Sequence, residues 1–98
     1  MTTQLRRGSS TRKIPGGKLI RVDASFLERV EGVKITGDFF LHPEETLERI
    51  EACLVGAALP LDRAGLVGCI EACLRDDQAE LIGVDPTDIV DTLAEAVR

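Results

Sequence analysis

The spacing of the apolar side chains changes along the chain, and this change limits the fold more than any other feature of the sequence. In residues 19–24 apolar and polar side chains alternate, so Ile20, Val22 and Ala24 share one face, as in a half-buried strand. After residue 43 the apolar side chains recur three or four positions apart, which is typical of amphipathic helices. The two spacings predict an α+β domain, in which a small antiparallel sheet of about two to three strands packs against about three helices.

A second strand is predicted from about Arg29 to Gly37. Val30 is out of phase with Val33 in this strand, and Gly32 lies between them, which indicates a β-bulge. The connection Ser25–Glu28 is short enough for a hairpin turn. The two strands are therefore expected to be antiparallel neighbours.

Three helices are expected after the strands. The first begins near Pro43, with proline at the first helical position. The second begins at Asp62 as N-cap, and the third at Asp85 as N-cap with Pro86 behind it. Residues 76–84 fit either a short helical turn or a third strand, because Leu81, Ile82 and Val84 are apolar.

Charge divides the chain into a basic part, residues 1–34, and an acidic part, residues 35–98, with a net charge of −5 overall. Such asymmetry favours an anionic partner for the basic part, although a basic tail on an acidic body explains it equally well. Residues 1–12 are rich in Ser, Thr, Gly and Arg and are expected to be a flexible basic tail, with one domain over residues 13–98.

Several classes of partner are disfavoured by composition. The three aromatic residues are all Phe, too few for the stacking platforms that bind single-stranded nucleic acid. No apolar run approaches the roughly 18 residues that span a bilayer, and the first residues do not resemble a secretory signal. The expectation is a cytoplasmic protein that binds neither nucleic acid nor membrane.

The three cysteines and the single histidine give no complete reactive site. Cys69 and Cys73 lie four positions apart within an apolar stripe, and Cys53 adjoins Leu54. Packing in the core is the favoured interpretation, with a zinc, iron–sulfur or redox site as the alternative. His42 has no second histidine with which to share acid–base chemistry.

The segment Pro15-Gly16-Gly17 has the composition of a tight turn, with a lysine on each side of it. It lacks the earlier glycine and the Ser/Thr of a P-loop, so it is not an independent nucleotide site. Lys13 and Lys18 flank the turn, and their amines are expected near one point, where they could reach a phosphate held by a partner.

Two motifs resemble the accessory, C-terminal domain of lipoate–protein ligase A. They are Lys13-Ile-Pro-Gly-Gly-Lys-Leu19 and Ile35-Thr-Gly-Asp-Phe-Phe-Leu41, the second followed by Pro43-Glu-Glu. The resemblance covers residues 12–98 and implies the form in which this domain is a separate small subunit, paired with a large catalytic subunit in a heterodimer. It also implies that the large subunit binds ATP, Mg and lipoate and makes lipoyl-adenylate, with the small subunit required for this step. The lipoyl group then passes to a lysine of an acceptor lipoyl domain.

The motifs also indicate which residues face the large subunit or its adenylate. In the family they are matched by Lys13, Gly16, Gly17, Lys18, Gly37, Asp38, Phe39 and Phe40. The glycines allow close approach of the backbone, Asp38 is expected to bond backbone amides, and one phenylalanine is expected to anchor the interface. No residue is expected to be catalytic or to bind metal, and a regulatory or metal-binding module is the alternative function.

Overall fold

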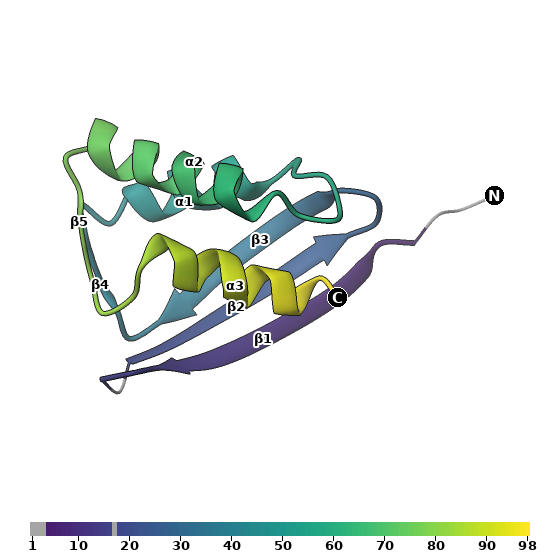
Figure 1. The fold of residues 1–98 in the computed structure, drawn as a ribbon, viewed down its shortest axis with the longest axis horizontal. Helices are drawn as coiled ribbons and strands as arrows, with labels where there is room; N and C mark the ends of the chain where they lie inside the picture. Colours follow the sequence, from purple (N-terminus) through teal and green to yellow (C-terminus); the bar gives the residue numbers. More distant parts are fainter. Residues whose placement is uncertain (1–3, 17) are drawn as a thin grey trace.

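A computed structural model describes residues 4–16 and 18–98 as one α+β fold (Figure 1). The strands are, in chain order, β1 (Arg6–Ile14), β2 (Lys18–Phe26), β3 (Val30–Gly37), β4 (Phe40–His42) and β5 (Glu80–Ile82). The helices are α1 (Thr46–Leu54), α2 (Arg63–Asp76) and α3 (Pro86–Ala96). None of the described helices is long and apolar enough to cross a membrane.

The main sheet has the order β1-β2-β3, and both strand pairs are antiparallel. On its inner face Ile20 and Val22 are fully buried, as the alternation predicts. α3 lies across β1 and β2, and α1 packs against β3, so the helices cover this one face (Figure 1). β4 and β5 pair separately as a two-stranded ribbon at the end of the molecule where β1 turns into β2.

The first strand corrects the prediction of a flexible tail over residues 1–12. Residues 6–12 belong to β1, which pairs with β2 along its whole length, from Arg6 opposite Phe26 to Ile14 opposite Lys18. The tail prediction rested on the lack of apolar residues, but an edge strand is held largely by its backbone ladder. Residues 1–3 lie outside the described part of the chain.

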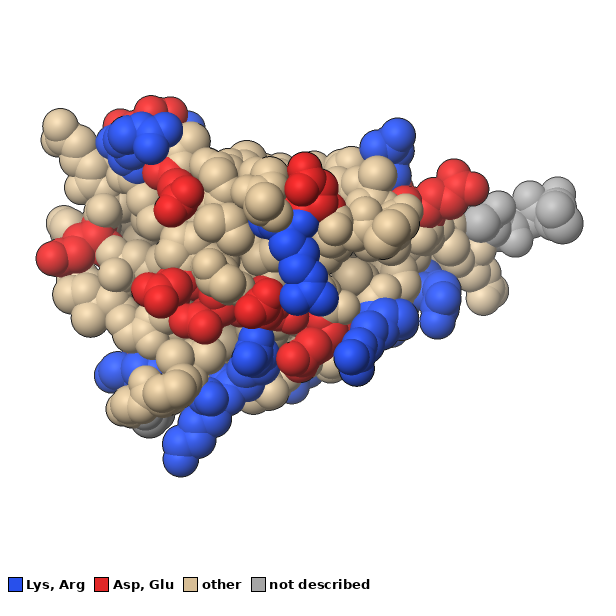
Figure 2. All heavy atoms as spheres, in the orientation of Figure 1, with Lys and Arg blue, Asp and Glu red and all other residues tan. Residues whose placement is uncertain are grey.

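The side chains on the inner face of β1 are mostly polar, and they pair with charged side chains of α3. Ser10 donates a hydrogen bond to Glu95 at 2.8 Å, and Arg12 lies 3.6 Å from Asp91 and 3.7 Å from Glu95. Figure 2 shows the acidic side chains over α3, with Lys and Arg side chains along the neighbouring β1 edge. Part of the basic segment is thus matched by acids of this same chain.

The bulge predicted in the second strand is confirmed. Ser25 lies opposite Gly32 but Phe26 lies opposite Val30, so Glu31 is the extra residue on β3. Because of the extra residue, the side chains before and after the bulge point to the same face of the sheet, and both Val30 and Ile35 are buried.

The two later helices begin where their caps predict. The Asp62 side chain accepts from the backbone N–H of Gly65, and the backbone N–H of Asp85 donates to Asp88. The segment between these helices contains a strand, β5, rather than a helical turn.

The first helix begins at Thr46, so the prediction of a start near Pro43 is wrong. Residues 43–45 form a turn, in which the N–H of Thr46 donates to the carbonyl of Pro43. Thr46 is fully buried, and its hydroxyl donates to Asp77 at 2.8 Å. This buried bond ties the start of α1 to the end of α2.

Two glycines, Gly8 and Gly68, provide a matched test of the packing of α3 on β1. A Cβ at Gly8 would collide with the carbonyl oxygen of Ala96, whereas a Cβ at Gly68 in α2 would meet open space. We expect Gly8→Ala to lower the free energy of unfolding by about 1–3 kcal/mol, because α3 must move off β1. Gly68→Ala should raise it by about 0.5–1 kcal/mol through better helix propensity. Urea unfolding measures both, and a Gly8→Ala protein as stable as wild type would contradict the close packing of α3 on β1.

Candidate functional site

The two sequence motifs meet at one end of the main sheet. The carboxylate of Asp38 accepts a hydrogen bond from the backbone N–H of Leu19 at 2.6 Å, and the N–H of Asp38 donates to the carbonyl of Leu19 at 3.2 Å. We call this pair of contacts the Leu19–Asp38 junction. The expectation that Asp38 bonds a backbone amide is confirmed, although the amide belongs to β2 rather than to its own turn.

Gly37 allows this junction to close. A Cβ on Gly37 would collide with the carbonyl oxygen of Leu19 and would press on the ring of Phe39. Gly16 lies in the β1–β2 turn with φ +102°, a conformation that favours glycine. Gly17, the other glycine of the motif, lies outside the described residues.

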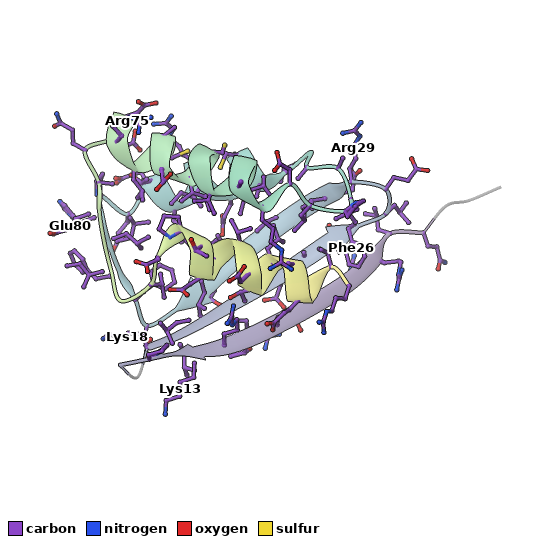
Figure 3. The ribbon with its side chains drawn as sticks, in the orientation of Figure 1. Lys13, Lys18, Phe26, Arg29, Arg75 and Glu80 are labelled. Carbon is purple, nitrogen blue, oxygen red and sulfur yellow. The ribbon has the colours of Figure 1, made fainter. Side chains whose placement is uncertain are left out.

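The two lysines of the first motif do not share one point, contrary to the prediction. Lys13 lies opposite Leu19 in the β1–β2 register, and Lys18 lies opposite the buried Ile14. Because side chains alternate along a strand, Lys13 is on the outer face of the sheet and Lys18 on the helix-covered face. Figure 3 shows Lys13 pointing away from the body of the protein. The aliphatic stem of Lys18 lies along the backbone at Gly83, where a Cβ would come within 2.9 Å of it.

The neighbouring phenylalanines take opposite directions, as extended backbone requires. Phe39 packs against the core, whereas Phe40, on β4, is 51% exposed. Phe40 pairs across the ribbon with Ile82, which is also 51% exposed, and its ring stacks on that of His42 with the centroids 6.3 Å apart. His42 pairs in turn with Glu80. We call these four residues of one ribbon face the ribbon patch.

A groove of about 700 Å³ adjoins the ribbon patch, between β3, β4 and α1. Phe39 and Phe40 contribute its aromatic part. Its carboxylates are Glu44, Glu45, Glu48 and Glu51. The Glu51 carboxylate already has a partner within this chain, because it accepts a hydrogen bond from the backbone N–H of Ile35 at 2.7 Å. An aromatic groove with an acidic wall suits apolar and cationic groups of a partner better than phosphate.

The sequence prediction did not include Ile82 and the acidic wall as part of this site. Ile82 was visible only as one of several apolar residues in a segment of undecided structure. Its pairing with Phe40 joins residues 42 positions apart in the chain, and no local pattern encodes that contact.

The three cysteines lie where α1 meets α2. Cys73 is buried in the core and its thiol lies 3.8 Å from the carbonyl of Arg49, while the Cys69 thiol lies 3.8 Å from the carbonyl of Cys53. Burial, reinforced by the neighbouring Cys69, raises the pKa of the Cys53 thiol. In the described part of the chain no cluster of three or more His, Cys, Asp or Glu could hold a metal ion.

A solved structure from Thermoplasma acidophilum is similar to this chain. It is an archaeal lipoylation system, described as a bipartite lipoate protein ligase and its E2 lipoyl domain. The similarity has a TM-score of 0.65 at 25% sequence identity, over 92% of this chain and 94% of the other. The resemblance to a bipartite lipoate–protein ligase is therefore confirmed in three dimensions. No protein-family model matches the sequence, and no curated protein matches it.

Because both chains are covered almost completely, the similarity extends to the whole domain. The lipoylation-related fold is thus established for the chain as a whole, while the roles of the individual motif residues remain predictions.

The Leu19–Asp38 junction can be tested by substitution. Asp38→Ala removes a charged acceptor from a backbone N–H and should lower the free energy of unfolding by about 1–2 kcal/mol. Asp38→Asn keeps an acceptor oxygen and should retain most of the stability. Equal stability of Asp38→Ala and wild type in urea unfolding would show that the junction contributes nothing to the fold.

Proposed function

We propose that this protein is the accessory subunit of a bipartite, cytoplasmic lipoate–protein ligase and forms a heterodimer with the large catalytic subunit. The observation that carries the proposal is the similarity, over 92% of the chain, to a structure of such a ligase system. The two motifs support it, because both contribute to one end of the domain.

In this proposal the large subunit binds ATP, Mg and lipoate. The lipoate carboxylate attacks the α-phosphorus of ATP, which gives lipoyl-adenylate and releases pyrophosphate. The amine of an acceptor lysine then attacks the activated carbonyl, which gives a lipoyl amide and releases AMP. The accessory subunit is required for the first step and contributes binding surface rather than a reacting group.

The ribbon patch is the surface that we assign to the large subunit. Exposed aromatic and aliphatic side chains, side by side on a paired ribbon, are typical anchors of a protein interface. Phe40 and Ile82 supply this apolar area, and the acidic wall of the groove can pair with cations of the large subunit. The contact would thus combine an apolar centre with a charged rim.

Lys18, rather than Lys13, is the motif lysine that we assign to the adenylate. Its stem lies against Gly83, immediately after the ribbon strand β5, so the amine belongs to the same end of the molecule as the ribbon patch. Lys13 lies on the other face of the sheet. An ammonium near this interface could stabilise the negative charge of a phosphate held by the large subunit.

The test is pyrophosphate release from ATP and lipoate by the large subunit, with and without this protein. We expect release only when both proteins are present. The paired substitution Phe40→Ser with Ile82→Ser should raise the concentration of this protein needed for half-maximal release about tenfold or more, because two interface anchors are lost. Val55→Ser is the matched control, because Val55 is 44% exposed but lies outside the ribbon, at the end of α1.

Two results would contradict this proposal. Equal pyrophosphate release with and without the protein would remove the accessory role. If release depends on the protein but the ribbon variant and the Val55→Ser control behave alike, the role stands and the ribbon patch is not the interface.

A further inference from the structure

The outer face of the main sheet is not covered by any described element. The helices pack on the inner face, and the outward positions of β1 and β2 are exposed or half-exposed and, apart from Leu19, polar. The outer positions, read across the three strands, form three rows, which are Arg7–Ser25–Gly32, Ser9–Asp23–Lys34 and Thr11–Arg21–Thr36. A sheet face without a partner layer is available to another molecule.

This face carries more cations than anions. Arg21 binds Asp23 through two hydrogen bonds, of 2.9 and 3.0 Å, so each of these charges is compensated and both carboxylate oxygens are occupied. Arg7, Lys13 and Lys34 also lie on this face, and among the described residues no carboxylate forms an ion pair with them. Arg7 and Lys13 lie six residues apart on β1, or about 20 Å at the usual rise of a strand.

The small residues of the first row leave a hollow in this face. Its volume is about 520 Å³, and Arg7, Lys34 and Asp23 are among the residues that line it, with the Asp23 carboxylate bonded to Arg21. The hydroxyl-bearing Ser9 and Ser25 line it as well, and Gly32 contributes no side chain. Acidic side chains of a partner could enter between the two cations and receive hydrogen bonds from the serines.

This face and the ribbon patch suit different kinds of partner. The ribbon patch exposes the apolar side chains of Phe40 and Ile82, which favours a lasting subunit contact, whereas a mostly polar face with dispersed cations favours a transient, electrostatically steered one. A ligase must release its acceptor protein after every transfer, so its acceptor is the transient partner. The helix side around α3 is acidic (Figure 2), so an acidic protein would be steered toward the sheet side.

We propose that the outer face of the β1-β2-β3 sheet docks an acidic surface of the protein that accepts the lipoyl group. This inference rests on the proposed function, because it assigns the second partner of the same ligase. A nucleic acid is the competing occupant of a basic face. The absence of aromatic side chains from the outward positions named above, together with the net charge of −5, disfavours it.

The experiment separates activation from transfer in the reconstituted two-subunit ligase. A double variant, Arg7→Glu with Ser25→Asp, reverses the charge of the hollow. We expect the KM for the acceptor lipoyl domain to rise about tenfold, while pyrophosphate release in the absence of acceptor is unchanged. For the wild-type ligase this KM should rise with ionic strength, and the dependence should weaken in the variant.

Two controls distinguish docking from general damage. Arg75→Glu makes the same charge change as Arg7→Glu, but at the exposed end of α2, on the helix side (Figure 3), and should leave the KM for the acceptor unchanged. Arg7→Lys keeps the positive charge and should retain most of the wild-type affinity. Thermal unfolding of each variant checks that it is folded.

The outcomes are distinct. An unchanged KM for the acceptor in the folded double variant, with wild-type activation intact, overturns the docking face alone. Salt-sensitive binding of a single-stranded or duplex oligonucleotide that the double variant loses, together with an unchanged KM, overturns it in favour of nucleic acid. If wild-type protein fails to stimulate pyrophosphate release at all, the proposed function fails, and the acceptor is rejected as the occupant with it.

Discussion

The contact between Asp38 and Leu19 determines how the chain is arranged at the end of the domain that carries the ribbon patch. After β3 the chain must leave the main sheet, and the backbone of Leu19 holds it through an N–H and a carbonyl bonded to the same residue. Gly37 makes the approach possible because any larger side chain would collide with β2. Phe39 then enters the core and Phe40 begins β4, so the exposed ribbon exists only because the chain turns at this point.

The electrostatics of the fold account for much of the charge asymmetry in the sequence. Arg12 on β1 faces Asp91 and Glu95 on α3, and Arg63 also binds Asp91 at 2.9 Å. Each such exposed pair contributes only about 0–1 kcal/mol, but together they tie α3 to the polar strand β1 and to α2. Three further cations of the basic segment, Arg7, Lys13 and Lys34, lie on the outer face of the sheet. The basic segment therefore pairs in part with acids of its own domain, and the docking proposal assigns its outward cations to a partner.

Much of this fold could be predicted from local patterns. Alternation identified β2, Gly32 marked the bulge, and Asp62 and Asp85 fixed the starts of two helices, because each signal depends on residues close in sequence. β1 could not be predicted in this way, since its inner face pairs with charges some 80 residues away. The start of α1 at Thr46 depends likewise on a bond to Asp77.

The candidate site was only partly visible in the sequence for the same reason. Gly37, Asp38 and Phe40 lie in one motif, and the structure places Asp38 against Leu19 of the other motif. The pairing of Phe40 with Ile82, and the separation of Lys13 from Lys18 onto opposite faces, are set by strand register. A resemblance in sequence indicates which residues matter, but register decides which surface each one faces.

Amide hydrogen exchange of this protein, alone and mixed with the large subunit, tests the central claim most directly. The account predicts slower exchange on mixing in residues 37–42 and 80–83, with the outer face of β1 unchanged in the absence of acceptor. Slower exchange confined to α2 or to β1 and β2, or no change at all, would contradict the assignment of this end of the domain to the ligase interface.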